Sequence, residues 1–444
     1  MDPPDTQYAR APDGTYLAYQ VVGEGPVDVL DQVDWPGNLD MQWEDPEGER
    51  WYRELASFSR LILHDRRGIG LSSRNVPLPN LETRVADTLT VLDAVGSERA
   101  VLSGIFESGA PNALLAATRP DRVRAMVWFE PTPRFGWAED YPWGLTEADR
   151  LAELEAIEKW GSLAYGSAFA AEWSGGHESD PATIARLMAK ASRNACTPDV
   201  ARALAEIWYD TDVRDVLPAV KVPTLIFAGS DDPGNAERAA YVASLIPGAE
   251  MRLFSGAIFA EEAARMAGEA IRRFIGVDRP AIELDTVLST VLFTDIVGST
   301  ERQARVGDHA WKELVQRHHA VVRAALQRWH GVEHDTAGDG FYATFDGPAR
   351  AIRCGLEITE RVRELGLQIR AGIHTGECER VDGKLAGLTV SIGARVASLA
   401  DPSRVLVSQT VKDLVAGSGF TFEDAGDHEL KGVPDRWRVY RVAA

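Results

Sequence analysis

The chain of 444 residues is poor in cysteine, with only Cys196, Cys354 and Cys378 and no Cys-x-x-Cys spacing. Three thiols without that spacing argue against a disulfide framework and against structural zinc, so we expect a reducing compartment. Long apolar runs are also lacking, because no stretch approaches the roughly 20 residues that span a bilayer. No signal peptide opens the chain. We therefore expect a cytoplasmic protein without membrane contact.

Positive charge is the second deficit. The chain holds 47 Lys and Arg against 67 Asp and Glu, for a formal net charge of −20, and no basic run appears. Such a surface repels phosphates, which argues against nucleic acid or anionic lipid as a partner. With 45% hydrophobic residues the chain is long enough to bury two substantial cores, so we expect two domains.

Two segments in the last third each place one carboxylate in a strand-like run. They are Val291-Leu-Phe-Thr-Asp295-Ile-Val-Gly-Ser-Thr300 and Ala337-Gly-Asp339-Gly-Phe-Tyr-Ala-Thr-Phe345. Asp295 interrupts an apolar run, where charge is costly unless a cation offsets it. Asp339 lies between two glycines, as a tight hairpin turn requires. Two such carboxylates brought together can hold two Mg²⁺ or Mn²⁺ ions on a triphosphate. The alternative, that each Asp only caps a turn, does not explain the charge inside the first strand.

From about Leu288 to Tyr440 the chain resembles class III nucleotidyl cyclase catalytic domains, which have a ferredoxin-like fold. The resemblance rests on the two segments above, on Arg370-Ala-Gly-Ile-His-Thr-Gly376 and on Thr389-Val-Ser-Ile-Gly-Ala-Arg395, in the expected order. It implies cyclisation of a nucleoside triphosphate to a 3′,5′-cyclic nucleotide and pyrophosphate. It also implies two Mg²⁺ or Mn²⁺ ions per site and a homodimer whose sites lie between the subunits.

The segment after Asp295 is the candidate triphosphate site, since a glycine-containing turn that feeds a helix N-terminus offers amides to phosphate oxygens. Its residues are Ile296, Val297, Gly298, Ser299 and Thr300. Thr300-Glu-Arg-Gln303 has a capping-box pattern and predicts a helix that runs to about Trp329.

Ser391 and Arg395 are four residues apart in a helical segment and share one face. A guanidinium there could stabilise charge that develops on the α-phosphate. Arg370 and Lys431 match family positions that contact the triphosphate. For each of these two, the alternative is a solvated surface charge.

Three positions depart from the adenylyl cyclase pattern. Asp335 replaces the usual adenine-reading Lys, Lys384 replaces its Asp partner, and Ser391 replaces the transition-state Asn. The inverted pair would suit the carbonyl and donors of guanine better than the edge of adenine. Alternatively, Asp335 and Lys384 form an ion pair and read no base. We expect ATP as the substrate, with GTP as the alternative.

The first two thirds of the chain alternates strand-like with helical runs, which predicts a mostly parallel sheet covered by helices. The expected strands are Tyr16–Val22, Val27–Leu30, Leu61–His64, Ala100–Gly104, Ala125–Phe129, Thr224–Ala228 and Glu250–Phe254. Residues 134–217 form a Trp- and Ala-rich helical insertion placed as a lid. The region resembles the α/β-hydrolase fold, and specifically the hydrolase-like domains fused to cyclases in mycobacteria. Four segments carry this resemblance: Pro12-Asp-Gly-Thr-Tyr-Leu-Ala-Tyr19, His64-Asp-Arg-Arg-Gly-Ile-Gly-Leu-Ser72, Leu92-Asp-Ala-Val-Gly-Ser-Glu-Arg99 and Val222-Pro-Thr-Leu-Ile-Phe-Ala-Gly229.

The catalytic pattern of that fold is absent. A working elbow reads Gly-x-Ser-x-Gly, but here the segment is Gly104-Ile-Phe-Glu-Ser-Gly109, with Phe106 at the nucleophile position. Phe259 stands at the expected histidine position, and Asp231 or Asp232 is the remnant of the acid. His64 and His177, the only histidines before residue 300, are not placed to serve. An acid without base or nucleophile performs no acyl transfer. The two Phe either fill the old pocket or support a dimer, or they line a pocket for a small apolar ligand.

We thus expect a hydrolase-like domain at residues 1–277, a linker at 278–286 and a cyclase domain at 287–444. Pro280 blocks a continuous helix through the linker. Three functions remain: an active cyclase, a catalytically dead cyclase-like module that binds triphosphate or only dimerises, and an esterase. The missing serine and histidine argue against the esterase.

Overall fold

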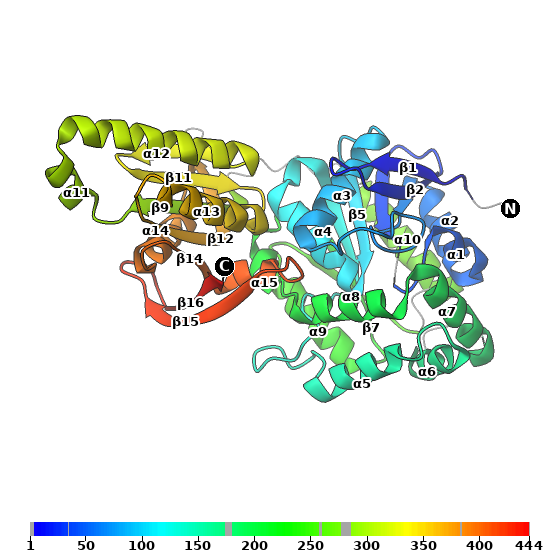
Figure 1. Ribbon diagram of the computed structural model, residues 1–444. Helices are drawn as coiled ribbons and strands as arrows, with labels where there is room; N and C mark the ends of the chain where they lie inside the picture. Colours follow the sequence, from blue (N-terminus) through cyan, green and yellow to red (C-terminus); the bar gives the residue numbers. More distant parts are fainter. Residues whose placement is uncertain are drawn as a thin grey trace. The chain divides into compact units, whose positions relative to one another are not determined.

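The computed structural model describes residues 4–33, 35–173, 180–256, 260–276, 286–381 and 384–443 (Figure 1). The chain divides into two compact units, residues 1–283 and residues 284–444. Apart from residue 286, the predicted linker lies outside the described residues. None of the described helices is both long and apolar enough to cross a membrane.

The first unit is built on an eight-stranded sheet in the order β1-β2-β4-β3-β5-β6-β7-β8. From β4 to β8 along this order each successive pair is parallel, whereas the β1–β2 and β2–β4 pairs are antiparallel. The seven predicted strands are present, and the antiparallel edge strand β1 was not predicted. Their bounds are β1 Gln7–Arg10, β2 Tyr16–Val22, β3 Asp28–Gln32, β4 Arg60–His64, β5 Ala100–Ile105, β6 Val123–Phe129, β7 Thr224–Gly229 and β8 Glu250–Phe254.

Helices cover this sheet, as the alternating pattern predicts. They are α1 Leu39–Glu44, α2 Pro46–Ala56, α3 Leu81–Ala94, α4 Gly109–Thr118, α9 Pro233–Leu245 and α10 Glu261–Ile275, with short 3₁₀ turns η1 Phe106–Ser108 and η2 Pro120–Arg122. The apolar strands β3, β5, β6 and β7 supply the centre of the core, against which α2 and α10 pack.

The insertion between β6 and β7 is helical, as predicted, and its described residues contain no strand beyond isolated bridges. It consists of α5 Glu147–Ile157, α6 Leu163–Trp173, α7 Pro181–Ala195, α8 Pro198–Asp210 and the 3₁₀ turn η4 Arg214–Ala219. Local signals define these helices: Asp180 accepts from the amides of Ala182 and Thr183 at 3.1 Å, with Pro181 in the first turn of α7.

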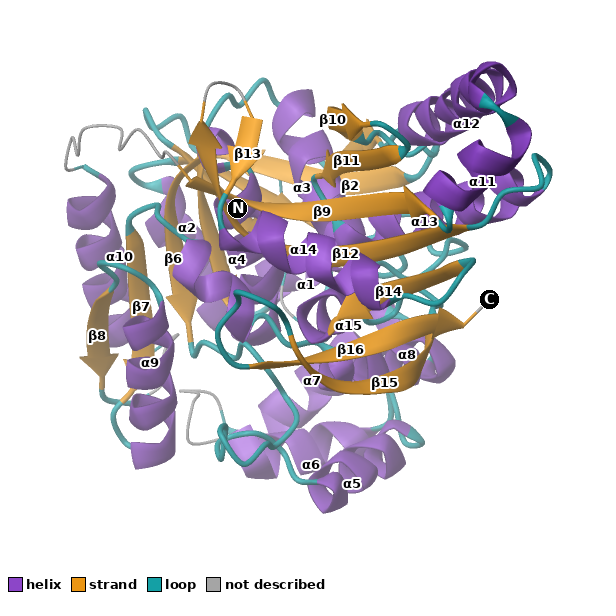
Figure 2. Cartoon of the chain, turned by 90° about the vertical axis from the view of Figure 1, so that its left-hand side faces the viewer, coloured by secondary structure: helices purple, strands orange, loops and turns teal. Residues whose placement is uncertain are grey.

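The second unit has its own sheet, in the order β10-β11-β9-β12-β14-β16-β15, with β13 paired to β12 (Figure 2). Only the β12–β14 pair is parallel. The strands are β9 Thr286–Ile296, β10 Val332–Ala337, β11 Gly340–Phe345, β12 Ile369–Val381, β13 Lys384–Ala386, β14 Arg404–Ser408, β15 Thr421–Glu429 and β16 Arg436–Ala443. The helices are α11 Ser299–Val306, α12 Asp308–Arg328, α13 Pro348–Arg363, α14 Leu388–Leu399 and α15 Gln409–Leu414.

Alternate residues of these strands face two different sets of helices. In β14, Val405 and Val407 enter the core formed with α12 and α13, whereas Leu406 packs with Ile392 and Val396 of α14. Helix α14 lies across β9 and β12, as Figure 2 shows. Two glycines permit this close approach: a Cβ on Gly372 would lie 2.0 Å from the amide nitrogen of Ala397, and one on Gly393 would lie 2.4 Å from a methyl of Val291.

One helix prediction is wrong. The expected capping box at Thr300 does not form, because helix α11 already begins at Ser299, with Gly298 as its N-cap and no side-chain cap. Gly298 has a φ of 65°, a left-handed conformation that glycine adopts freely. The expected single helix to Trp329 is also divided, because Gly307, with φ 83° and ψ 159°, interrupts it between α11 and α12.

Candidate active site

The two predicted metal ligands lie on neighbouring strands of the second sheet. Phe341 of β11 pairs with Thr294 of β9, so Gly340 lies opposite Asp295. Ala337 pairs with Gly340, which leaves Gly338 and Asp339 as the two residues of the hairpin turn. Gly338 has the positive φ, 67°, that such a turn requires. Because paired strands are about 4.8 Å apart, the turn places Asp339 beside the end of β9 that carries Asp295.

The surroundings of these two carboxylates suit a cation. Asp295 is half exposed and accepts a hydrogen bond from Arg370 Nη2 of β12 at 3.0 Å. Asp339 keeps one buried carboxylate oxygen, Oδ2, without a hydrogen-bond partner. A buried acceptor without a partner is costly, and carboxylate oxygen is the ligand that Mg²⁺ and Mn²⁺ prefer.

No cluster of three or more His, Cys, Asp or Glu side chains able to hold a metal occurs among the described residues. Two carboxylates alone do not enclose a cation. They match the way Mg²⁺ is commonly bound, by one or two carboxylates, with phosphate oxygens and water as the other ligands.

The predicted phosphate segment follows Asp295 directly. Ile296 is buried at the end of β9, and the amide of Val297 donates to the carbonyl of Gln368 at 2.9 Å. The chain then turns at Gly298 into α11, which begins with Ser299 and Thr300. The first amides of a helix have no partner within it and carry the positive end of its dipole. This turn therefore presents donors beside the two carboxylates.

Ser391, Arg395 and Lys431 form a second group. The side chains of Ser391 and Arg395, both on α14, are exposed, and Arg395 Nε donates to the backbone carbonyl of Lys431 at 3.2 Å. Within the described part of the chain, no hydrogen bond or ion pair joins these three residues to Asp295, Asp339 or Arg370. One chain therefore contains two separate sets of candidate catalytic residues.

The inverted base-reading pair is only partly described. Asp335 is exposed on β10, where it pairs with Tyr342 and accepts from the amide of Thr336 at 2.8 Å. Lys384 begins β13, and its side chain lies outside the described residues. Tyr342 lies between the two positions, since its hydroxyl donates to the carbonyl of Leu385 at 3.0 Å. Neither base reading nor an Asp335–Lys384 ion pair is tested by this arrangement.

Aromatic side chains support this site, and the sequence pattern did not predict them. Phe293 stacks on Tyr342 with ring centroids 4.8 Å apart, and Tyr342 stacks on His334 at 5.2 Å. Behind the hairpin turn, His319 Nε2 of α12 lies 3.0 Å from the carbonyl of Gly338. Its neighbour His318 is buried, and that burial lowers the pKa of His318 to about 4. Adjacent histidines on the inner face of a predicted helix are the signal that could have indicated this contact.

In the first unit, the elbow keeps the backbone of the hydrolase fold without its nucleophile. Phe106 has a φ of 48°, a conformation that is strained for a residue with a side chain. Ser108 is buried, and its hydroxyl donates to the carbonyl of Ile105 at 2.6 Å and accepts from the Ile105 amide at 2.7 Å. The serine is thereby engaged with the backbone.

The other triad positions have structural contacts. Asp231 accepts from Ser255 Oγ at 2.9 Å and from the amide of Gly256 at 2.7 Å, and these bonds lower its pKa. Asp232 caps helix α9. His64 is buried in β4, where its Nε2 lies 3.4 Å from the side-chain Nε2 of Gln32, and burial lowers the pKa of His64 to about 4. Phe259 and His177 lie outside the described residues.

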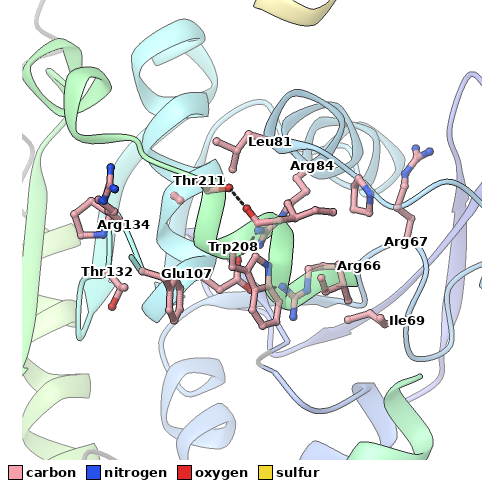
Figure 3. Close-up of a pocket in the computed structure, with 16 residues that line it drawn as sticks. Arg66, Arg67, Ile69, Leu81, Arg84, Glu107, Thr132, Arg134, Trp208 and Thr211 are labelled. Atoms are coloured by element: carbon pink, nitrogen blue, oxygen red, sulfur yellow. Dashed lines mark hydrogen bonds and ion pairs between the residues drawn. The ribbon is translucent and has the colours of Figure 1, made fainter. Parts of the chain in front are cut away.

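A cavity lies beside this elbow, and it is not the apolar pocket that the two Phe suggested. Arg66, Arg84 and Glu107 line it together with apolar residues of the lid, and Phe106 is not part of its lining (Figure 3). The charges of the lining make a purely apolar ligand a poor match for this cavity.

Comparisons with known proteins agree with both folds. Residues 283–444 match the family model described as the adenylate and guanylate cyclase catalytic domain. The chain is 31% identical over 130 residues to an uncharacterised protein of Mycobacterium tuberculosis strain H37Rv, covering 29% of this chain and 42% of that protein. It is 26% identical over 206 residues to a receptor-type adenylate cyclase of Trypanosoma brucei brucei, covering 35% of this chain and 17% of that protein.

Among solved structures, an esterase from Exiguobacterium antarcticum superposes with a TM-score of 0.53 at 22% identity, covering 62% of this chain and all of that chain. This likeness shows the fold alone. The chain spans between 19% and 65% of the length of the first curated relatives that it matches.

Proposed function

We propose that the chain converts ATP to 3′,5′-cyclic AMP and pyrophosphate, because residues 283–444 match the family model of the adenylate and guanylate cyclase catalytic domain. The observation that carries this proposal is the pair of strand-borne carboxylates, Asp295 and Asp339, with an unpartnered buried oxygen on Asp339. Asp295 and Asp339 would hold two Mg²⁺ or Mn²⁺ ions. Bound there, the metals supply activation of the attacking hydroxyl and neutralisation of the leaving pyrophosphate.

The other residues act on the substrate. The amides of the segment from Ile296 to Thr300 bind phosphate oxygens at the start of α11. Arg370, which pairs with Asp295 at 3.0 Å, would direct its guanidinium to the triphosphate. Lys431 adds a further positive charge to the triphosphate. Arg395 stabilises charge that develops on the α-phosphate, with Ser391 on the same helix face in place of the usual amide.

The two separate groups of residues support a shared site. Among the described residues, Arg395 and Lys431 make no hydrogen bond or ion pair with Asp295 or Asp339 of their own chain, which supports a site completed by a second copy. We therefore propose a homodimer with each site built from both subunits.

GTP is the second candidate substrate, and the reason is the inverted pair. Asp335 offers acceptors to the ring donors of guanine, and an ammonium at position 384 would donate to its carbonyl. A catalytically weak or dead module that binds triphosphate is the remaining alternative, since Ser391 is a shorter helper than the usual Asn.

The first unit is proposed as a regulatory or dimerising domain and not as an esterase. Phe106 cannot attack a carbonyl, and Ser108 is held by backbone hydrogen bonds.

One assay tests the proposal: purified full-length chain with Mn²⁺ and either ATP or GTP, with cyclic nucleotide as the readout. Asp295→Ala and Asp339→Ala should each abolish product. Asp346→Ala is a matched control, because Asp346 is an exposed carboxylate of the same unit that pairs with Arg350. Turnover near wild type in either site variant under excess Mn²⁺ would refute the two-metal assignment. Triphosphate binding without product in the wild type would favour the dead module.

A further inference from the structure

The cavity beside the elbow of the first unit is lined by four parts of the fold. Arg66 and Ile69 come from the loop after β4, Arg84 comes from α3, and Glu107 belongs to the elbow itself, while Trp208 of α8 closes it from the lid (Figure 3). It offers about 20 Å³ to the centres of water-sized groups. Since one water needs roughly 10–15 Å³ on this measure, the cavity holds one or two such groups.

The buried charges around this cavity do not balance. Arg66 and Arg84 both donate to the carboxylate of Glu107, Arg66 to Oε1 and Arg84 to Oε2. Among the described residues, Glu107 is the one carboxylate within ion-pair distance of either guanidinium. Burial alone would raise the pKa of Glu107, but the two guanidiniums hold it below its ordinary value. In direct contact, two guanidiniums therefore share one carboxylate, while Asp65 and Asp87 act on Arg66 and Arg84 without an ion pair to them.

The neighbouring arginine does not add to this excess. Arg67 lies in the same loop, but it is paired with Asp87 at 2.5 Å and with Asp13 at 2.6 Å. The imbalance is thus confined to the guanidiniums that contact Glu107.

Part of the donor capacity of these two side chains is unused. Nε and Nη2 of Arg66 and Nε of Arg84 are buried without a hydrogen-bond partner, and both side chains are about 5% exposed or less. Nε and Nη2 form one edge of a guanidinium, the edge that can bind both oxygens of a carboxylate in parallel. The Arg66 guanidinium lies 5.5 Å from the ring of Trp208 and 6.0 Å from that of Trp35, and it packs against this pair of rings, whose centroids are 5.0 Å apart.

We propose that this cavity is a binding site for a small monocarboxylate, whose two oxygens pair with the free edge of Arg66. The short apolar remainder of such a ligand would contact Ile69 and Trp208. The available space excludes a long acyl chain. Glu107 disfavours a dianion such as phosphate, because its carboxylate already pairs with both guanidiniums and would repel a second negative charge.

The first unit would then sense a small organic acid in a cavity beside the elbow, next to the nucleophile position that Phe106 occupies. This inference concerns the first unit alone and does not depend on turnover by the second.

The test uses the full-length chain and sodium acetate as the probe, followed by calorimetric titration and by the thermal unfolding midpoint at constant ionic strength. Acetamide, which has nearly the same shape without the charge, is the matched ligand. Acetate should bind and raise the midpoint as its concentration increases. Acetamide should do neither. Equal effects of acetate and acetamide, or an effect of chloride as large as that of acetate, would overturn the proposal.

Two variants with opposite expected signs locate the site. Arg66→Gln removes the carboxylate edge and should weaken acetate binding about tenfold or more. Glu107→Gln removes the internal anion and should strengthen acetate binding by a similar factor. Arg74→Gln is the control, because Arg74 lies in the same loop, is exposed and donates to the carbonyls of Gly70 and Asn194 at 2.7 Å.

If Arg66→Gln fails to fold, the acetate affinity of Glu107→Gln tests the proposal by itself, because this change preserves the volume of the side chain at position 107 and leaves both arginines in place. Unchanged or weaker acetate binding in folded Glu107→Gln protein contradicts the proposal. So does a loss of binding in Arg74→Gln as large as that in Arg66→Gln.

Discussion

The ion pair between Asp295 and Arg370 gives a prediction that separates stability from chemistry. Asp295→Asn removes the charge and keeps the shape of the side chain. The Asp295 side chain is 48% exposed and the Arg370 side chain 34% exposed, so the pair is screened by solvent. It should contribute at most about 1 kcal/mol to the free energy of unfolding. For a unit of this size that corresponds to a fall of the midpoint by no more than about 4 °C.

The effect on chemistry should be much larger. Asp295→Asn takes one anionic ligand from the proposed metal site, and cyclic nucleotide formation should fall by at least about a hundredfold. Arg370→Gln is the matched variant, because it breaks the same ion pair and keeps both carboxylates. It should unfold at nearly the same midpoint as Asp295→Asn. Yet it should bind Mn²⁺ up to about fivefold more tightly than the wild type, since no guanidinium competes for Asp295.

Two measurements on the wild type, Asp295→Asn and Arg370→Gln check these expectations. They are thermal unfolding, and Mn²⁺ binding followed by electron paramagnetic resonance in the absence of triphosphate. Equal Mn²⁺ affinity in Asp295→Asn and the wild type would refute the assignment of Asp295 as a ligand. Weaker Mn²⁺ binding in Arg370→Gln than in the wild type would refute the competition between the guanidinium and the metal. If the unfolding midpoint falls by far more than 4 °C in both variants, Asp295 and Arg370 serve to stabilise the fold and not to bind a metal.

Three further outcomes are expected. Mixing inactive Arg395→Ala protein with inactive Asp295→Ala protein should restore one working site per heterodimer; no activity from heterodimers shown to form would count against shared sites. The double change Asp335→Lys with Lys384→Asp should shift the ratio of kcat/KM values toward ATP by about tenfold or more if the pair reads the base; an unchanged ratio rejects that role. A serine-directed phosphonate should not label Ser108, and mass spectrometry that finds the adduct would contradict an inactive elbow.

Much of the molecule follows from local pattern. The seven strands expected in the first unit are present because each is a short apolar run between turn signals, which are properties of neighbouring residues. The hairpin at Gly338 was predictable for the same reason, since a two-residue turn needs a positive φ. The capping box at Thr300 was predicted wrongly, because the left-handed Gly298 is the N-cap and the helix begins one residue before Thr300, at Ser299. Local sequence pattern does not fix the first residue of a helix to better than one or two positions.

Residue types and spacing predicted a carboxylate pair for a metal-bound triphosphate and a strongly acidic chain, and a family resemblance added an elbow without its serine. Which side chains meet was decided only by the tertiary structure. Arg370 faces Asp295 because β12 pairs with β9 in one register, and His319 reaches Gly338 because α12 packs behind the hairpin. Arg66 and Arg84 share Glu107 because a loop, a helix and the elbow converge, although the three are far apart in sequence. Such contacts depend on strand register and on packing between distant segments, and no short pattern encodes either.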